Sequence, residues 1–316
     1  HTHSESEDSF YEELVGLGDG SPVDVKHSAD DLLFLYTGGT TGMPKGVMWR
    51  HDDLFKVQGT GGSPLLGISP CADLEELLER LSTQSAPVNL PLPPIMHGTG
   101  LLSAVGAMSS GGTCVTLPSR SFEPELALAN IDAHKVTSVT IVGDAFARPL
   151  LDSLNDNPQK YDISSIYAIS SSGVMWTRDI KAGLLKHNVN MLLIDKFSSS
   201  EAIGLGTSIM TSDEDIDVAK FALGPACKVF NEAGIELHPG ADEPGMVAVT
   251  GFLPTGYYKD QEKTDKVFRV FDGVRYSVPG DWVQIEDDGS LTLLGRGSNC
   301  INTAGERFFR RKLKKR

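Results

Sequence analysis

The hydrophobic pattern of the chain changes near residue 205. Before that point, short unbroken apolar runs alternate with stretches whose apolar residues recur at helical spacing. The apolar runs lie at residues 32–36, 113–117, 136–142, 166–170 and 191–194, and the helical stretches lie at residues 73–81, 124–135, 145–154 and 177–187. Unbroken apolar runs are typical of strands buried on both faces. Strands that alternate with helices predict an α/β fold with a mainly parallel sheet and covering helices.

Beyond residue 205 the strand candidates are short, and Gly, Pro and Asp turns separate them. These candidates lie at residues 228–230, 246–250, 282–285 and 291–294. Residues 287–290 (DDGS) form a good hairpin signal between the last two candidates. We therefore predict a small antiparallel β subdomain at residues 206–295, following an α/β subdomain at residues 1–205.

The composition is that of a globular chain and excludes several classes of protein. The 316 residues are 40% hydrophobic and 22% charged, with 42 acidic and 28 basic residues and a net charge of −14. This charge repels phosphate backbones, so no nucleic-acid partner is expected. No apolar run approaches the roughly 20 residues of a membrane span. The first residues resemble no signal peptide and include no initiator Met, so the sequence is expected to be a fragment.

The four cysteines are scattered and form no CxxC pair. This pattern fits a reducing compartment better than a disulfide framework, and a cytoplasmic location is therefore expected. His1 and His3 are only a weak signal for a metal site, because no Cys or carboxylate stands at a fixed spacing from them.

A glycine- and threonine-rich segment follows the first predicted strand. Residues 36–46 read YTGGTTGMPKG. Glycines let the backbone approach a ligand and turn its N–H groups toward anionic oxygens, while threonine hydroxyls and a lysine add further donors. The segment predicts a phosphate-binding loop; the alternative is a flexible glycine turn. It is not a Walker A loop, because Pro44 replaces the Gly before Lys45 and Gly46 replaces the magnesium-binding Ser or Thr.

Read with its flanks, this loop resembles the signature of the adenylate-forming superfamily, which includes acyl-CoA synthetases, luciferase and peptide-synthetase adenylation domains. Further segments resemble motifs of that family in the same order: PIMHG at residues 94–98, FSSSE at 197–201, GYYK at 256–259, GD at 280–281 and GR at 295–296. The resemblance covers residues 31–307. The sequences at residues 49–53, 143–149 and 300–303 are most similar to actinobacterial fatty-acyl and steroid side-chain CoA ligases.

The resemblance implies a reaction in two steps that uses ATP, Mg²⁺ and CoA. A fatty-acid-like or steroid side-chain carboxylate attacks the α-phosphate of ATP to give an acyl-adenylate and pyrophosphate, and the thiol of CoA then displaces AMP. Both steps build up negative charge, so hydrogen-bond donors and magnesium around the phosphates are expected to supply most of the catalysis.

The resemblance also assigns roles to individual residues. The phosphates are expected to be held by Thr37, Gly38, Gly39, Thr40, Thr41, Gly42 and Lys45. Ser172, Gly173 and Val174 are expected to line the adenine pocket and Phe197 to stack on adenine, while Ser198 and Ser200 are also expected to bind the nucleotide. Asp281 is expected at the ribose, Arg296 at the ribose or a phosphate, and Glu201 as the magnesium ligand. Thr41, Lys45, His97 and Glu201 are expected to act in catalysis, with His97 closing the acyl pocket, which Gly143 and Asp144 are expected to border.

Each of these residues also has an ordinary structural interpretation. His97 could be a hydrogen-bonded core histidine, Phe197 a core side chain and Asp281 a turn residue, while Glu201 and Arg296 could be surface charges. The chain also departs from the family pattern: Phe197 stands where Tyr is usual, and Ser198 and Ser200 replace Gly and Thr. The lost hydroxyl removes one polar contact to the nucleotide.

The family pattern includes a longer stretch before the loop and a C-terminal lid whose lysine contacts the carboxylate and the α-phosphate. No segment here resembles that lysine motif, so the lid is expected to be missing and residues 296–316 to be a hinge remnant with a basic tail. Codons for FPEEVEEA, shifted by one nucleotide, can read FRRKLKKR, the sequence of residues 309–316. The tail is therefore hypothesised to be a frameshift product, with a polybasic anion-binding tail as the alternative.

The sequence thus leaves three functions open. The first is an acyl-CoA synthetase core with a nucleotide-binding α/β subdomain. The second is a catalytically impaired remnant that binds ATP or AMP, and the third is a fragment of a carrier-protein-dependent adenylation enzyme.

Overall fold

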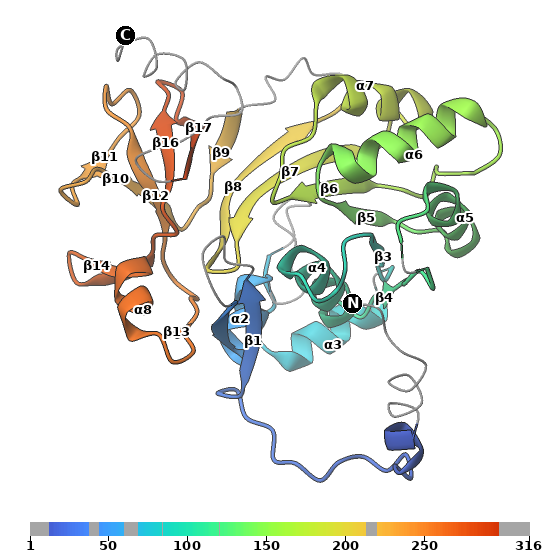
Figure 1. Ribbon diagram of the computed structural model, residues 1–316, viewed down its shortest axis with the longest axis horizontal. Helices are drawn as coiled ribbons and strands as arrows, with labels where there is room; N and C mark the ends of the chain where they lie inside the picture. Colours follow the sequence, from blue (N-terminus) through green and yellow to red (C-terminus); the bar gives the residue numbers. More distant parts are fainter. Residues whose placement is uncertain are drawn as a thin grey trace.

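The computed structural model describes residues 13–37, 44–59, 69–83, 85–119, 121–212 and 220–296 (Figure 1). Its main feature is a large mixed sheet with one parallel half and one antiparallel half. The strands of the parallel half, in spatial order, are β4 (Thr113–Cys114), β3 (Val88–Pro91), β5 (Ser138–Ile141), β6 (Ala168–Ser172) and β7 (Leu192–Ser199). The fold class predicted from the sequence is confirmed.

Helices cover both faces of the parallel half. In Figure 1, α6 and α7 lie on one side of the sheet and α4 lies on the other. The helices are α3 (Leu74–Thr83), α4 (Gly98–Ser109), α5 (Pro124–His134), α6 (Asp144–Asp156) and α7 (Arg178–His187). The largest core cluster joins this sheet to α5, α6 and α7 through fully buried residues such as Ile131, Ile141 and Leu184. Burying one such side chain contributes about 1.5–3 kcal/mol relative to leaving it exposed.

The antiparallel half begins at β8 (Ala202–Met210), which pairs with β7. The following strands lie in the order β9 (Lys220–Leu223), β17 (Ser290–Arg296), β16 (Asp281–Ile285), β12 (Gly245–Val249), β10 (Cys227–Phe230) and β11 (Glu236–Leu237). The hairpin β14 (Phe268–Phe271) and β15 (Val274–Ser277) attaches to β12 through Ser277. The predicted turn between β16 and β17 is confirmed, with the Gly289 N–H donating to the Glu286 carbonyl.

A separate sheet of three strands contains β1 (Leu32–Thr37), β2 (Lys45–Arg50) and β13 (Gly256–Tyr257). The strand predicted at residues 32–36 is confirmed, but its predicted burial on both faces is wrong. Leu35 is buried, whereas Phe34 and Tyr36 are exposed. The reason is that β1 is an edge strand of an antiparallel sheet, so only every second side chain packs against the core.

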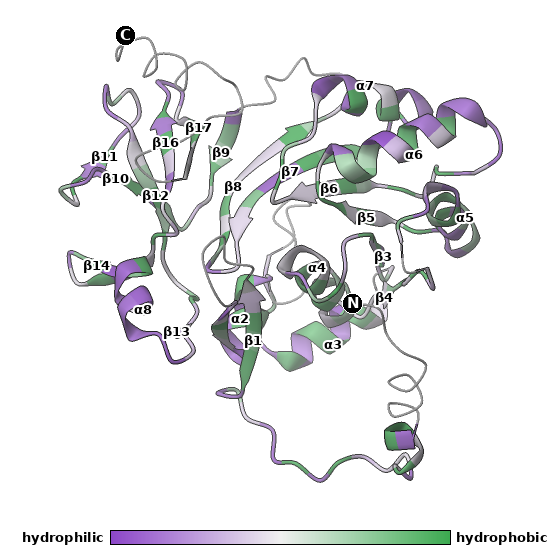
Figure 2. Cartoon of the chain, in the orientation of Figure 1, coloured by the Kyte–Doolittle hydropathy of each residue, from purple (hydrophilic) through white to green (hydrophobic). Residues whose placement is uncertain are grey.

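Two short helices adjoin this sheet in the chain. α2 (His51–Val57) follows β2 directly, and α8 (Gln261–Val267) follows β13. Figure 2 shows that α8 is hydrophilic along most of its length, and Val267 is its one buried residue. The Asp260 carboxylate caps the start of α8 by accepting from the Lys263 N–H.

Residue 205, the predicted boundary between the two subdomains, falls within β8. Because β8 pairs with β7 on one side and β9 on the other, backbone hydrogen bonding continues across that position. The division into subdomains stays a prediction. Within the part of the chain that the structure describes, no helix has both the length and the apolar character needed to cross a membrane.

Candidate active site

The hairpin β1–β2 forms the base of the glycine-rich segment. Thr37, the last residue of β1, pairs with Lys45, the first residue of β2. Residues 38–43, which include the predicted phosphate-binding Gly38, Gly39, Thr40, Thr41 and Gly42, lie outside the described residues, as does the Thr37 side chain. The segment therefore joins two antiparallel strands, whereas a Walker A loop joins a strand to a helix. The sequence-based exclusion of a Walker A loop agrees with this geometry.

Glu201 lies buried at the turn between β7 and β8, with 8% of its surface exposed. The Tyr257 hydroxyl donates to its Oε1 atom at 2.5 Å, and the Ser277 hydroxyl donates to its backbone carbonyl at 2.7 Å. A buried carboxylate is costly unless it is paired or hydrogen-bonded, and the Tyr257 hydroxyl meets part of that requirement. The interpretation of Glu201 as a solvated surface charge is therefore wrong.

Three of the predicted segments meet around β2. The Trp49 indole N–H donates to the Ser200 carbonyl at 3.0 Å, which joins β2 to the 197–201 segment. The 256–259 segment adds β13 to the free edge of β2, where the Tyr258 N–H donates to the Gly46 carbonyl at 2.8 Å. The structure thus brings the base of the glycine-rich loop, the Glu201 segment and the Gly-Tyr-Tyr segment into direct contact.

The 94–98 segment reaches the same place through Gly98. A Cβ atom added at Gly98 would lie 3.2 Å from the Leu35 side chain and 3.4 Å from the Ser200 hydroxyl, so the 94–98 segment packs closely against β1 and the 197–201 segment. His97 is the residue before α4, at the N-cap position. Its side chain is exposed and makes no capping hydrogen bond to the helix. The interpretation of His97 as a core histidine is wrong, and its role as a gate of the acyl pocket stays a prediction.

Lys45 makes an ion pair that the sequence did not predict. Its Nζ lies 2.7 Å from Asp260 Oδ2, while the lysine side chain is 43% exposed. The Lys45 hydrogen bond, aided by the Lys263 backbone N–H, holds the pKa of Asp260 below its usual value. Asp260 therefore stays charged, and it positions Lys45 at the mouth of the glycine-rich loop.

The predicted adenine-pocket residues lie at the ends of β6 and β7. Ser172 ends β6, and Gly173 has a φ of 92°, a conformation that favours glycine. Val174 is exposed, and its place in the adenine pocket stays a prediction. Phe197 is half-buried and packs against Phe221 with ring centroids 5.8 Å apart. Stacking of Phe197 on adenine stays a prediction.

The two serines of the 197–201 segment have different surroundings. The Ser198 hydroxyl accepts from the Gly204 N–H at 3.0 Å, so it stabilises the turn between β7 and β8. The Ser200 hydroxyl lies near Gly98, as described above. A bulge between Phe197 and Ser199 interrupts the pairing of β7 with β8 next to these residues.

Asp281 and Arg296, the predicted ribose-binding residues, lie opposite each other in the ladder between β16 and β17. Asp281 follows Gly280, whose φ is 93°.

Gly143 and Asp144 lie at the start of α6. The Asp144 carboxylate accepts from the Thr177 N–H at 2.8 Å, and the Gly143 N–H donates to the Ser171 hydroxyl at 2.9 Å. Gly143 and Asp144 thus join the start of α6 to β6 and to the segment after it, and their place beside the acyl site stays a prediction.

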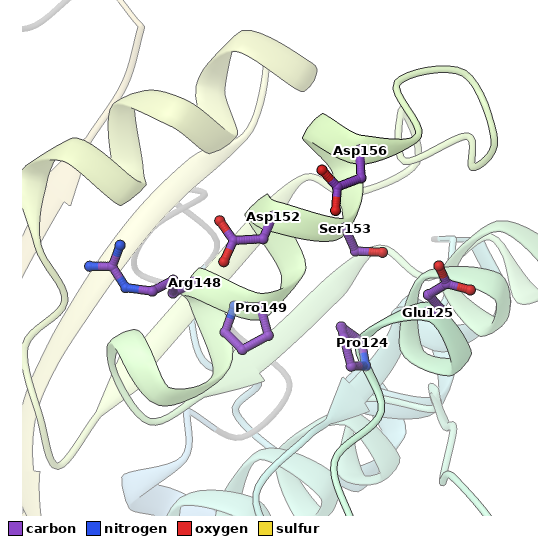
Figure 3. Close-up of a pocket in the computed structure, with 7 residues that line it drawn as sticks. All are labelled: Pro124, Glu125, Arg148, Pro149, Asp152, Ser153 and Asp156. Carbon is purple, nitrogen blue, oxygen red and sulfur yellow. The ribbon is translucent and has the colours of Figure 1, made fainter.

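A groove of about 380 Å³ lies between α5 and α6 and contains none of the predicted site residues. Figure 3 shows its lining, which consists of Pro124, Glu125, Arg148, Pro149, Asp152, Ser153 and Asp156. The Ser153 hydroxyl is buried there without a hydrogen-bond partner. We assign the groove no part in the candidate active site.

The donor set fits a magnesium ion of the kind that binds together with a nucleotide. Within the described residues no three His, Cys, Asp or Glu side chains cluster as a metal cage would need. Mg²⁺ in phosphate-transfer sites usually takes one or two carboxylates, several waters and oxygens of the phosphates. Glu201 is a carboxylate that lies beside the glycine-rich hairpin, and its role as the magnesium ligand stays a prediction. His1 and His3 lie outside the described residues.

Solved structures with the same arrangement define the fold class. The chain superimposes on a long-chain-fatty-acid-CoA ligase from Archaeoglobus fulgidus with a TM-score of 0.68 and 21% identity, covering 90% of this chain and 56% of that one. Apo MatB from Rhodopseudomonas palustris gives a TM-score of 0.66 and 24% identity, covering 90% of this chain and 52% of that one. The chain therefore has the fold of the adenylate-forming enzymes.

The family follows from the sequence match. Residues 2–258 match the family described as AMP-binding enzyme, and the chain belongs to that family. It is 38% identical over 286 residues to the medium/long-chain-fatty-acid–CoA/3-oxocholest-4-en-26-oate–CoA ligase of Mycolicibacterium smegmatis, which covers 89% of this chain and 51% of that protein. The 3-oxocholest-4-en-26-oate–CoA ligase of Rhodococcus rhodochrous is 39% identical over 292 residues, with the same coverage. The chain spans about half the length of these relatives.

Proposed function

We propose that the chain is the core of an acid–thiol ligase that activates a carboxylate with ATP and Mg²⁺ and transfers the acyl group to CoA. The observation that carries the proposal is the meeting of three signature segments at β2, with the buried Glu201 carboxylate hydrogen-bonded to Tyr257 beside the glycine-rich hairpin. The names of the relatives in M. smegmatis and R. rhodochrous favour a medium- or long-chain fatty acid or a steroid side-chain acid as the substrate.

The residues of this chain would divide the work as follows. Lys45, positioned by Asp260, would bind phosphate oxygens and offset negative charge as it develops. Glu201 would hold Mg²⁺, with the Tyr257 hydroxyl fixing the orientation of the carboxylate. The bound ion would neutralise charge on the phosphates. Ser172, Gly173, Val174, Phe197, Ser198 and Ser200 would surround adenine, and Asp281 and Arg296 would bind ribose.

A second candidate is a nucleotide-binding chain that does not complete the reaction. This is the second of the functions that the sequence leaves open. In this case ATP or AMP would bind, but no pyrophosphate would be released when acid is added.

Binding and turnover need separate measurements. Titration calorimetry with Mg·ATP tests the nucleotide site, and pyrophosphate release with decanoic acid tests activation of the acid. We expect Lys45→Met and Glu201→Gln each to weaken Mg·ATP binding on the order of tenfold, since each removes a charged contact. Lys186→Met, on the exposed side of α7, is the control. Equal affinity in all four proteins would contradict the proposed site.

The acyl acceptor and the location of the protein also remain proposals. Thioester formation with CoA, compared with a carrier domain, separates an acyl-CoA ligase from a carrier-dependent adenylation enzyme. We also propose a cytoplasmic location, supported by the free thiols of Cys71, Cys114 and Cys227.

A further inference from the structure

Lys196 is an exposed lysine on a strand in the interior of the sheet. β7 is hydrogen-bonded to β6 on one side and to β8 on the other. The two residues before Lys196, Ile194 and Asp195, are 1% and 2% exposed. Within the described part of the chain, Lys196 has no hydrogen-bond or ion-pair partner. An ammonium group at such a position calls for an explanation, because interior strands usually carry apolar residues.

The side chain of Lys196 lies on the face of the sheet that α7 does not cover. Asp195 pairs with Lys181 of α7, which places Asp195 on the α7 face. Since successive side chains of a strand alternate between faces, Lys196 lies on the opposite face. In Figure 1 this is the side of the sheet on which α4 lies. In the register, Ser172 of β6 and Thr207 of β8 flank Lys196.

This position is at the carboxyl edge of the parallel strands. Ser172 is the last residue of β6, and the glycine turn at Gly173 follows it. In open α/β sheets, ligands bind in the crevice beyond the carboxyl ends of the strands. Burial among the surrounding protein also lowers the pKa of Lys196. Water reaches the side chain, yet protein surrounds the ammonium, as in a recess.

The distance along β7 separates Lys196 from the reacting end of the substrate. Under the proposed function, the reacting carboxylate meets the phosphates beside Glu201. The strand continues from Lys196 to Ser199 before the turn that carries Glu201, a length of roughly 10 Å at about 3.3 Å per residue. Lys196 is therefore set back from the reaction centre by about that length.

We propose that Lys196 is a specificity-determining residue that pairs with a second anionic group of the acid substrate, remote from the reacting carboxylate. The substrate class is then an α,ω-dicarboxylic acid or another long acid with a distal anion. This inference rests on the proposed function, because that function places the reacting carboxylate beside Glu201. An ion pair in this recess would restore the favourable interactions that the ammonium loses on leaving water.

The test compares two acids of equal length, decanedioate and decanoate, by titration calorimetry with the full chain. We expect decanedioate to bind more tightly than decanoate. In Lys196→Met the ratio of the two affinities should fall on the order of tenfold, the size of one charge-assisted hydrogen bond. Lys196→Arg should retain most of the ratio, and Lys186→Met, an exposed lysine on the other face, should leave it unchanged.

Two outcomes would overturn the inference: an equal ratio in the wild-type chain and in Lys196→Met, or tighter binding of decanoate by the wild-type chain. A second measurement reads the site directly: amine-reactive labelling of Lys196, mapped by mass spectrometry, should be slowed by decanedioate and not by decanoate. Mg·ATP titrations of the same proteins separate the two proposals. If Mg·ATP binds and responds to Lys45→Met while the acid ratio stays equal, only the role of Lys196 is wrong; if neither ligand binds, both proposals are wrong.

Discussion

The hydrogen bond between Tyr257 and Glu201 joins two segments that lie 56 residues apart. Removing the hydroxyl leaves a buried carboxylate oxygen without this donor. We expect Tyr257→Phe to lower the free energy of unfolding by about 1–3 kcal/mol. Urea denaturation measures the change. Tyr258→Phe is the matched control, because Tyr258 is 44% exposed and packs against Phe34 through its ring. Equal loss in both variants would contradict the importance of the Glu201 contact.

Cys227 is a second residue whose surroundings give a measurable property. Burial raises the pKa of its thiol to about 12, and the Sγ–H donates to the Gly204 carbonyl at 3.4 Å. Because the thiolate is the reactive form, Cys227 should resist alkylation in the folded chain at pH 8 and react once urea unfolds it. Mass mapping after a timed iodoacetamide pulse checks this, with the half-buried Cys114 as the comparison. Alkylation of Cys227 at similar rates with and without urea would be the contrary result.

At the residue scale, sequence comparison could predict which segments form the site but not the contacts that hold them. Glu201 and Lys45 were predicted from the resemblance of their segments to motifs of the family. Their partners Tyr257 and Asp260 could not be predicted as partners, because those contacts depend on β13 pairing with β2. Lys196 gave no signal of its own in the sequence. It differs from an ordinary surface lysine only because β7 is paired on both sides, and the sequence does not show that pairing.

Among the elements, α7 and β7 are joined by a buried ion pair between Lys181 and Asp195, with the Lys181 Nζ 5.4 Å from the Trp176 ring centroid. Both charged residues are almost fully buried. We expect Lys181→Met to destabilise the chain by about 3–5 kcal/mol, because it leaves the Asp195 charge unpaired. The double variant Lys181→Met/Asp195→Leu should recover most of that loss. Thermal or urea unfolding of the single and double variants measures both, and a double variant as unstable as Lys181→Met would contradict the argument.

The same pair predicts a dependence on pH. Burial raises the pKa of Asp195 above 3.8 despite the opposing effect of Lys181. A carboxyl whose folded pKa is raised contributes stability that is present below its unfolded pKa and is lost as pH rises through the folded value. The deficit of Lys181→Met should therefore be smaller at pH 4 than at pH 7, relative to the wild-type chain. An identical deficit at both values would contradict the assignment of the buried charge.

The elements themselves were largely predictable, because periodicity and caps determine them locally. The predicted helix at residues 124–135 is α5, which starts at Pro124 and ends where Lys135 adopts a left-handed conformation. The predicted strand at residues 113–117 is only the two-residue β4, since β4 pairs with β3 through Thr113 and Cys114 alone. An apolar run does not show how many strands will pair with it. For the same reason, the prediction that β1 is buried on both faces was wrong.

For the whole molecule, the continuous pairing from β7 through β8 and β9 to β17 predicts joint unfolding of the two halves. The three tryptophans report on different parts: Trp49 on the small sheet, Trp176 on the parallel core and Trp282 on the antiparallel half. We expect variants with a single tryptophan, made by Trp→Phe changes, to show coincident urea midpoints by fluorescence and by circular dichroism. A separate transition reported by Trp282 would show that the antiparallel half unfolds independently.

The place of β13 beside β2 also sets an order of events during synthesis. The hairpin of β1 and β2 leaves the ribosome before β13 does. The edge of β2 that pairs with β13 therefore stays unpaired until residues 256–258 have been translated and released from the exit tunnel. A nascent chain stalled before that point cannot complete the small sheet, whereas one stalled after β13 has left the tunnel can. Under the proposed function, nucleotide binding by the growing polypeptide would therefore begin only after β13 has paired with β2.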